Sequence, residues 1–182
     1  MKLAIVIIVI VVVVALYAIL YNGLVRSRNQ AQEFESQIDV QLKRRTDLIP
    51  NLVETVKGYA SHEKSTLEQV VQMRNSVVAA DNLQDKVAAD NRLTGALRQV
   101  FALAENYPDL KANQEFGKLM EELTNTENKV AYSRQAYNSA VQYYNTATQT
   151  FPRNLIAHIH SFQPMTYLQI PEAEKAAPQV KF

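Results

Sequence analysis

Residues 3–20 read LAIVIIVIVVVVALYAIL, a run of eighteen residues without a charge, a proline or a glycine. As an α-helix, this run would be about 27 Å long, which is close to the hydrocarbon thickness of a bilayer. In lipid, the backbone polar groups are satisfied only in a helix or a closed barrel, and one segment cannot close a barrel. This constraint overrules the strand preference of the β-branched residues 5–14. The run predicts a single transmembrane helix.

A cleavable signal peptide is the alternative, because Lys2 and the amino terminus form a short basic region before the run. Two features argue against cleavage: the apolar run exceeds the usual length, and residues 21–25 (YNGLV) contain no pair of small residues at cleavage spacing. Tyr17 and Tyr21 stand where an interfacial aromatic belt is expected. We therefore expect residues 1–22 to remain as a membrane anchor that contacts lipid through residues 3–20.

The charge balance limits the partners of the rest of the chain. Without Lys2, 18 basic residues face 18 acidic ones. A neutral domain is a poor nucleic-acid binder, since affinity for phosphate rests on clustered positive charge. The chain contains no cysteine, which excludes disulfides and thiolate metal sites. Basic residues near the two ends of the anchor almost tie and lean slightly towards a cytoplasmic C-terminal side.

Sparse helix breakers predict few, long helices after the anchor. The chain has four glycines and six prolines, and apolar side chains recur with the period of a helix. The first heptad stripe is Leu24, Ala31, Ile38, Arg45, Leu52 and Tyr59, with a companion set of Glu35, Leu42, Ile49, Val56 and Glu63 beside it. Pro50 interrupts this stripe and removes a backbone hydrogen bond. We expect a kink near 46–50; a break with Thr46 or Asp47 as N-cap is the less favoured alternative, because the stripe keeps its phase.

The later segments follow the same pattern. Residues 67–78 and 83–105 predict two amphipathic helices, and a turn at 106–109 lets Asp109 cap the helix that follows. A second stripe predicts a helix of about 40 residues in coiled-coil-like packing, which Pro152 ends. Its heptad positions are Phe116, Leu123, Val130, Tyr137, Tyr144 and Phe151. Residues 154–159 suggest a short extra turn.

The sequence therefore predicts an all-α fold, in which a single transmembrane helix precedes an elongated antiparallel bundle of long helices. The expected divisions are the anchor at 1–22, the helical bundle at 23–162 and a flexible C-terminal tail at 163–182.

No pattern for catalysis or metal binding emerges. His158 and His160 are two residues apart, so on a helix they point away from each other and cannot share a metal ion. Glycine is too scarce for a phosphate-binding loop, and no serine or threonine lies in a nucleophile-elbow context. We expect no enzymatic activity, no metal and no cofactor.

Charged residues within the apolar stripes carry more information. Arg45 lies in the first stripe, and Glu127 and Arg134 lie beside positions of the second. The favoured interpretation is an ion pair that sets the alignment of long helices at some cost in stability; the alternative is a surface that recognises a partner. The first interpretation predicts that Arg45→Met with Glu127→Leu keeps the fold and loosens the register.

Several motifs resemble the LemA family of bacterial membrane proteins. They are residues 21–25 (YNGLV), 38–53 (IDVQLKRRTDLIPNLV), 107–113 (YPDLKAN), 127–128 (EN), 134–138 (RQAYN), 144–145 (YN) and 151–152 (FP). The resemblance extends from the anchor to about Phe162. The resemblance implies an N-terminal transmembrane helix, a helical bundle mostly in the cytoplasm and no catalytic residues. Some members of the family are associated with magnetosome membranes. The candidate register or interaction residues are Arg45, Asp47, Pro50, Glu127, Arg134, Tyr137 and Asn138.

Three functions remain open on this basis. The first is a non-enzymatic scaffold of the bacterial inner membrane that forms homo-oligomers and organises or shapes the membrane. The second is an adaptor that recruits another membrane or envelope protein. An enzyme with an unrecognised site is the third.

Overall fold

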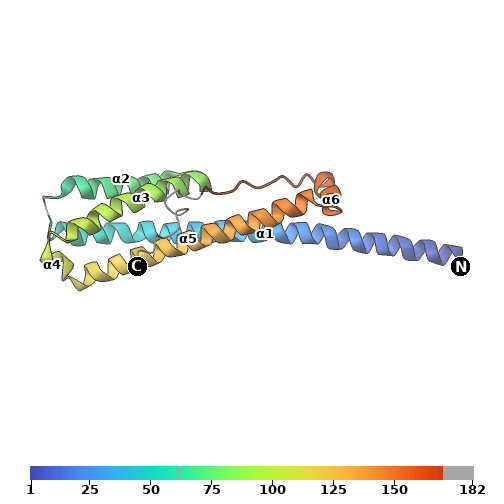
Figure 1. Cartoon of the computed structure of the whole chain (residues 1–182), viewed down its shortest axis with the longest axis horizontal. Helices are drawn as coiled ribbons and strands as arrows, with labels where there is room; N and C mark the ends of the chain where they lie inside the picture. The colour runs from blue at the N-terminus through green and yellow to red at the C-terminus, as the bar shows by residue number, and fades with distance from the viewer. Residues whose placement is uncertain (61, 170–182) are drawn as a thin grey trace, which may run out of the picture. The chain divides into compact units, whose positions relative to one another are not determined.

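The computed structural model describes residues 1–60 and 62–169 of the chain (Figure 1). This part is 84% helical and contains no strand, which confirms the all-α class. Its helices are α1 (Lys2–Lys57), α2 (Lys64–Ala79), α3 (Leu83–Ala104), α4 (Pro108–Lys111), α5 (Gln114–Gln149) and α6 (Arg153–Ile159).

The apolar run forms the first part of α1, and within the described residues α1 alone is long and apolar enough to cross a membrane. Its side chains between Leu3 and Leu16 are all exposed, as expected for a segment that faces lipid. Gly23 lies inside the helix and does not end it. The predicted boundary at residue 22 therefore does not coincide with a helix end. The division into 1–22, 23–162 and 163–182 stays a prediction.

The chain divides into two compact units. The anchor unit comprises Met1–Glu35 and Gln135–Tyr167; the bundle unit comprises Ser36–Arg134 together with Leu168 and Gln169 among the described residues. Both α1 and α5 contribute to each unit, so each unit contains segments that are distant in the sequence.

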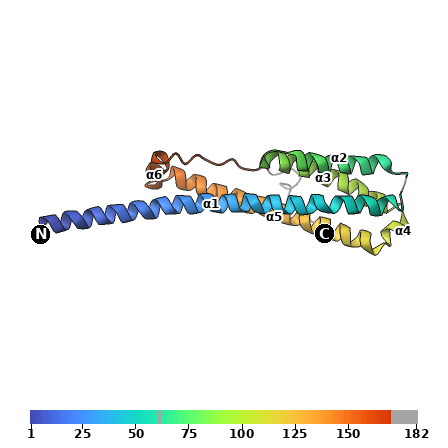
Figure 2. The same ribbon diagram turned by 180° about the vertical axis from the view of Figure 1, so that it is seen from behind.

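The bundle unit consists of the second part of α1, then α2, α3, α4 and the first part of α5. The chain reverses its direction between α1 and α2, between α2 and α3, and between α3 and α5, and α2 and α3 lie side by side in Figures 1 and 2. The predicted stripes are buried here, with Ile38, Ile49, Leu52, Leu123 and Val130 at most 1% exposed. This burial follows from the 3.6-residue period that places the apolar side chains of each helix on one face.

Two capping details distinguish the bundle unit from the sequence prediction. Asn82 caps α3, because its Oδ1 accepts a hydrogen bond from the Asp85 amide at 2.9 Å. The predicted cap of the long helix was wrong: Asp109 lies inside α4, and the Phe116 amide donates instead to Oδ1 of Asn113 at 2.9 Å. The insertion of the single-turn helix α4 moved the start of α5 beyond the reach of Asp109.

The two heptad stripes end where their helices end. Tyr59 is 43% exposed and follows α1, and Phe151 is 80% exposed and follows α5. Each stripe therefore predicted one buried position too many, because the last member lies in a connection rather than in the helix. Pro50 lies within α1, so a helix break with Thr46 or Asp47 as N-cap is wrong.

In the anchor unit, α1 and α5 pack against α6 around a small core. Leu24, Ala147, Ile156 and Ala157 are buried in this core, and Leu20, Tyr21 and Phe162 pack against it. Partial burial begins at Leu20, directly after the segment with the exposed apolar side chains.

The residues after Phe162 bind to α5. Asn145 exchanges two hydrogen bonds with the Met165 backbone, each at 2.9 Å, and the hydroxyls of Tyr144 and Tyr137 donate to the carbonyls of Gln163 and Thr166. The sequence predicted a flexible tail from residue 163, whereas these hydrogen bonds hold residues 163, 165 and 166 against α5. Residues 170–182 of that predicted tail lie outside the described residues.

Candidate functional site

The most distinctive polar feature of the bundle unit is the side chain of Arg45, which is 1% exposed. Helix α1 brings Arg45 into the core because it occupies a heptad position between Ile38 and Leu52. Its Nη1 donates to Asp90 of α3 at 2.8 Å and its Nη2 donates to Glu127 of α5 at 2.9 Å. One guanidinium thus connects three helices.

The pair of Arg45 and Glu127 has the geometry that the register interpretation requires. Glu127 is also within 3.8 Å of Arg98 of α3, and its side chain is 37% exposed. Arg45 Nε is buried and has no hydrogen-bond partner within the described part of the chain. A buried donor without a partner costs about 1–3 kcal/mol, so the cluster is not optimised for stability alone.

Asp90 is the member of the cluster that the sequence analysis missed. Its side chain is 3% exposed, and burial raises its pKa above the ordinary value of 3.8, although Arg45 and Arg134 act in the opposite direction. The sequence did indicate that Asp90 could be buried, because it lies three residues after Val87 and three before Leu93 on the apolar face of α3. The reasoning that selected Arg45 applies equally to this position.

Arg134 lies at the edge of the same cluster. Its Nη1 donates to Oδ1 of Asn91 of α3 at 3.1 Å, and the side chain is largely buried. The charge of Arg134 also lowers the pKa of Asp90. The structure therefore brings Arg45, Glu127 and Arg134 of the predicted set into one region.

Pro50 leaves an unpaired backbone carbonyl that another helix satisfies. A proline at position 50 cannot donate to the carbonyl of Thr46, four residues earlier. Arg74 of α2 supplies the missing donor, with its Nε 3.1 Å from the Thr46 oxygen. This contact explains how α1 continues through Pro50, and it couples α1 to α2 at a defined position.

The remaining predicted residues lie apart from this cluster. Asp47 is exposed and pairs with Lys43 one turn earlier, at 2.8 Å. Tyr137 belongs to the anchor unit, where its hydroxyl donates to the Thr166 carbonyl at 3.1 Å. Asn138 follows it on α5 and is partly exposed. The role of all seven residues in register or interaction stays a prediction.

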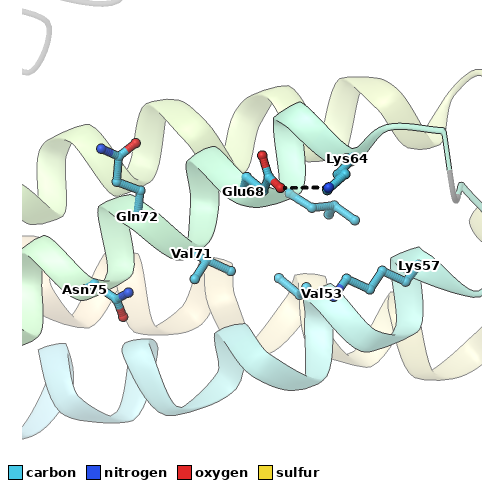
Figure 3. Close-up of a pocket in the computed structure, with 8 residues that line it drawn as sticks. Val53, Lys57, Lys64, Glu68, Val71, Gln72 and Asn75 are labelled. Atoms are coloured by element: carbon cyan, nitrogen blue, oxygen red, sulfur yellow. Dashed lines mark ion pairs between the residues drawn. The ribbon is translucent and has the colours of Figure 1, made fainter.

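The bundle unit also has a groove between α1 and α2, which Figure 3 shows with its lining side chains. Its volume is about 690 Å³, and Val53, Leu67 and Val71 line it. Lys64 and Glu68 lie at its edge and form an ion pair of 3.6 Å. This lining offers an apolar contact surface, and Lys57 adds a second positive charge beside the ion pair.

The described residues contain no group of three histidine, aspartate or glutamate side chains that could hold a metal ion. His158 is exposed on α6, and His160 contacts Tyr17 and Tyr21 instead.

Fold and site together define an all-helical protein whose described residues contain one candidate membrane-spanning helix and a bundle with a buried arginine that pairs with two carboxylates. The family model described as the LemA family matches residues 34–182. The chain belongs to the LemA family.

Curated relatives extend this similarity. The magnetosome protein MamQ of Magnetospirillum gryphiswaldense is 24% identical over 193 residues, which cover 92% of this chain and 71% of that protein. Protein LemA of Metamycoplasma hominis is 27% identical over 159 residues, 85% of this chain and 71% of its own. The magnetosome protein MamQ 2 of Paramagnetospirillum magneticum is 26% identical over 175 residues, 82% of this chain and 64% of its own. Family and anchor together indicate a membrane-associated protein.

Proposed function

We propose that this protein is a non-enzymatic scaffold that is anchored in the membrane by residues 3–20 and associates with copies of itself to organise the membrane. The observation that carries the proposal is the continuity of α1 in the anchor unit. The helix passes without interruption from exposed apolar side chains to the packed core at Leu24. Any contact that fixes the anchor unit therefore also fixes the position of its transmembrane segment.

A groove in the anchor unit supplies a surface for self-association. Its volume is about 680 Å³, and its lining combines larger side chains, among them Phe34, with five small residues: Gly23, Ser27, Ala136, Ser139 and Ala140. Small residues allow a second helix to approach closely, in membranes and beside them. Tyr143 at the edge is 56% exposed and offers an aromatic side chain to a partner. The occupant that we propose is the same face of a second copy.

The relatives support a membrane role in general terms. Two of the proteins compared are called magnetosome proteins, and a magnetosome is a membrane compartment. We extend the association with a membrane to this chain, and we place it as a single-pass protein of the bacterial inner membrane with its C-terminal part in the cytoplasm. Protease treatment of spheroplasts tests the sidedness: removal of the bundle unit from outside would contradict it.

The adaptor alternative has one observation of its own, the groove between α1 and α2 in the bundle unit (Figure 3). An apolar groove between helices can accept an amphipathic helix from another protein. A stoichiometric partner that is lost on Val71→Glu would favour the adaptor over the scaffold.

The molar mass of the full-length chain in mild detergent, measured by light scattering, tests self-association. We expect a homo-oligomer for the natural sequence and a shift to monomer for Ser139→Trp, because the indole fills the groove of the anchor unit. Asn125→Trp is the matched control, since Asn125 is an exposed residue of the same helix outside this groove. A monomeric natural chain at high concentration would contradict the scaffold.

A further inference from the structure

Helix α6 has one buried face and one exposed apolar face. Ile156 and Ala157 pack into the core of the anchor unit. Phe151 lies in the connection before the helix, and Leu155 and Ile159 are four residues apart on its other side, which places these two on one face. Phe151, Leu155 and Ile159 are 80%, 55% and 65% exposed. Three large apolar side chains on one short stretch are more than the single exposed hydrophobics that are normal on a protein surface.

Contacts fix α6 beside the end of the apolar run. His160, directly after α6, accepts or donates a hydrogen bond with the Tyr17 hydroxyl at 2.5 Å, and its ring is 4.7 Å from that of Tyr21. At the other end of α6, Arg153 Nη2 lies 3.8 Å from the position that a Cβ of residue 23 would occupy. Figures 1 and 2 show α6 next to α1 within this unit. The helix is thus level with residues 17–23.

This level is where the membrane surface must lie. A span of residues 3–20 leaves the hydrocarbon region near Leu20, and Tyr17 and Tyr21 occupy the positions of an interfacial aromatic belt. Because α6 is bound to those tyrosines, the bilayer surface adjoins α6 in every copy of the chain.

We propose that α6 is an interfacial helix, which inserts Phe151, Leu155 and Ile159 into the boundary between headgroups and acyl chains of the same membrane that α1 crosses. Interfacial helices bury their apolar face about 5–10 Å into this boundary, and basic side chains beside them attract anionic headgroups. Arg153 on α6 and Arg26 on α1 supply that charge. The anchor unit is then bound to the membrane at two places, which fixes its tilt on the surface. This inference goes beyond self-association, because it requires only one copy of the chain.

The absence of cysteine makes a direct test possible, since one introduced thiol is the only labelling site. The Leu155→Cys and Ile159→Cys variants of the full-length chain are each labelled with an environment-sensitive nitrobenzoxadiazole dye. Each labelled variant is reconstituted at one copy per nanodisc of phosphatidylcholine and phosphatidylglycerol. Ile19→Cys is the lipid-facing reference, and Val78→Cys is the matched control, because Val78 is 61% exposed on α2 of the bundle unit. Spin-labelled phosphatidylcholine, with the label at a shallow or a deep acyl position, quenches dyes that contact lipid.

We expect blue-shifted emission at positions 155 and 159 and a loss of fluorescence with spin-labelled lipid, larger for the shallow label than for the deep one. The Val78→Cys dye should show neither effect. Emission and quenching equal to those at position 78 would overturn the proposal. Blue-shifted emission without quenching by lipid would also overturn it, because protein rather than the membrane would then cover this face.

Discussion

The two units of the molecule hold their helices together by different means. In the bundle unit, the buried guanidinium of Arg45 connects α1, α3 and α5 through carboxylates, and Arg74 donates to a carbonyl of α1. In the anchor unit, side chains of α5 bind backbone groups of the segment after α6, and the core is small and apolar. Charged side chains thus connect different helices of the bundle unit. In the anchor unit, hydrogen bonds between side chains of α5 and backbone groups hold the segment after α6 in place instead. The two units should therefore respond differently when these contacts are removed.

The largest expected effect follows from Arg45→Met, which leaves Asp90 charged and unpaired in the core of the bundle unit. Removing one member of a buried ion pair typically costs about 3–5 kcal/mol of the free energy of unfolding. Urea denaturation of the full-length chain in detergent, followed by circular dichroism, measures it.

The matched control is the triple variant Arg45→Met, Asp90→Leu, Glu127→Leu, which removes Arg45 together with both carboxylates that it binds. Apolar replacement of a whole buried ion-pair group is often neutral or stabilising, so we expect most of the loss to be recovered. The double variant predicted from sequence, Arg45→Met with Glu127→Leu, should not recover it, because Asp90 remains. Equal stability of Arg45→Met and the natural chain would contradict a structural role for this cluster.

The second prediction concerns pH. Burial already raises the pKa of Asp90 above 3.8, and Arg45→Met removes the first of the charges that lower it. A raised pKa in the folded state adds stability that is complete below the unfolded pKa and is lost as the pH rises through the folded pKa. The deficit of Arg45→Met relative to the natural chain should therefore shrink as the pH falls from 7 towards 4. A deficit independent of pH would show that Asp90 does not carry the cost.

The third prediction applies to the anchor unit. Asn145→Ala removes both hydrogen bonds to the Met165 backbone and should cost about 1–3 kcal/mol locally. Faster hydrogen exchange of the Met165 amide, without a change in the amides of α3, would show that the effect is confined to this unit. Thr148→Ala is the control, because the Thr148 hydroxyl donates only to the carbonyl of Asn145 in its own helix.

The smallest expected change in the free energy of unfolding concerns the Thr46 carbonyl, which Pro50 leaves without a backbone donor. Arg74→Met leaves the Thr46 carbonyl without its donor and should cost about 1 kcal/mol. In a Pro50→Ala background, residue 50 has an amide that can donate to Thr46, so the same Arg74→Met change should cost less. A double-mutant cycle by urea denaturation measures this coupling. Equal costs in both backgrounds would mean that Arg74 acts through other contacts.

The sequence predicted what periodicity encodes. The stripes of α1 and α5 placed Ile38, Leu52, Leu123 and Val130 in the core, and the position of Arg45 among them indicated a buried charge. The partner Asp90 was missed because the search for charges was limited to those two stripes. The donor to Thr46 was not predictable, since a proline reveals the free carbonyl but only tertiary packing decides which helix supplies the donor.

The binding of the segment after Phe162 is the clearest failure of sequence reasoning. Asn145 recognises the amide and carbonyl of Met165, and backbone groups are the same at every residue. Nothing in the side chains of 163–166 therefore marked this segment as bound.

In the scaffold that we propose, copies of this chain associate in the membrane through the anchor unit. Energy transfer between chains labelled with donor and acceptor dyes at Asn125→Cys, reconstituted together in lipid vesicles, tests this association most directly. We predict transfer that persists as the ratio of lipid to protein increases and that disappears with Ser139→Trp. Transfer that declines on lipid dilution to the level of randomly placed molecules would contradict the proposal.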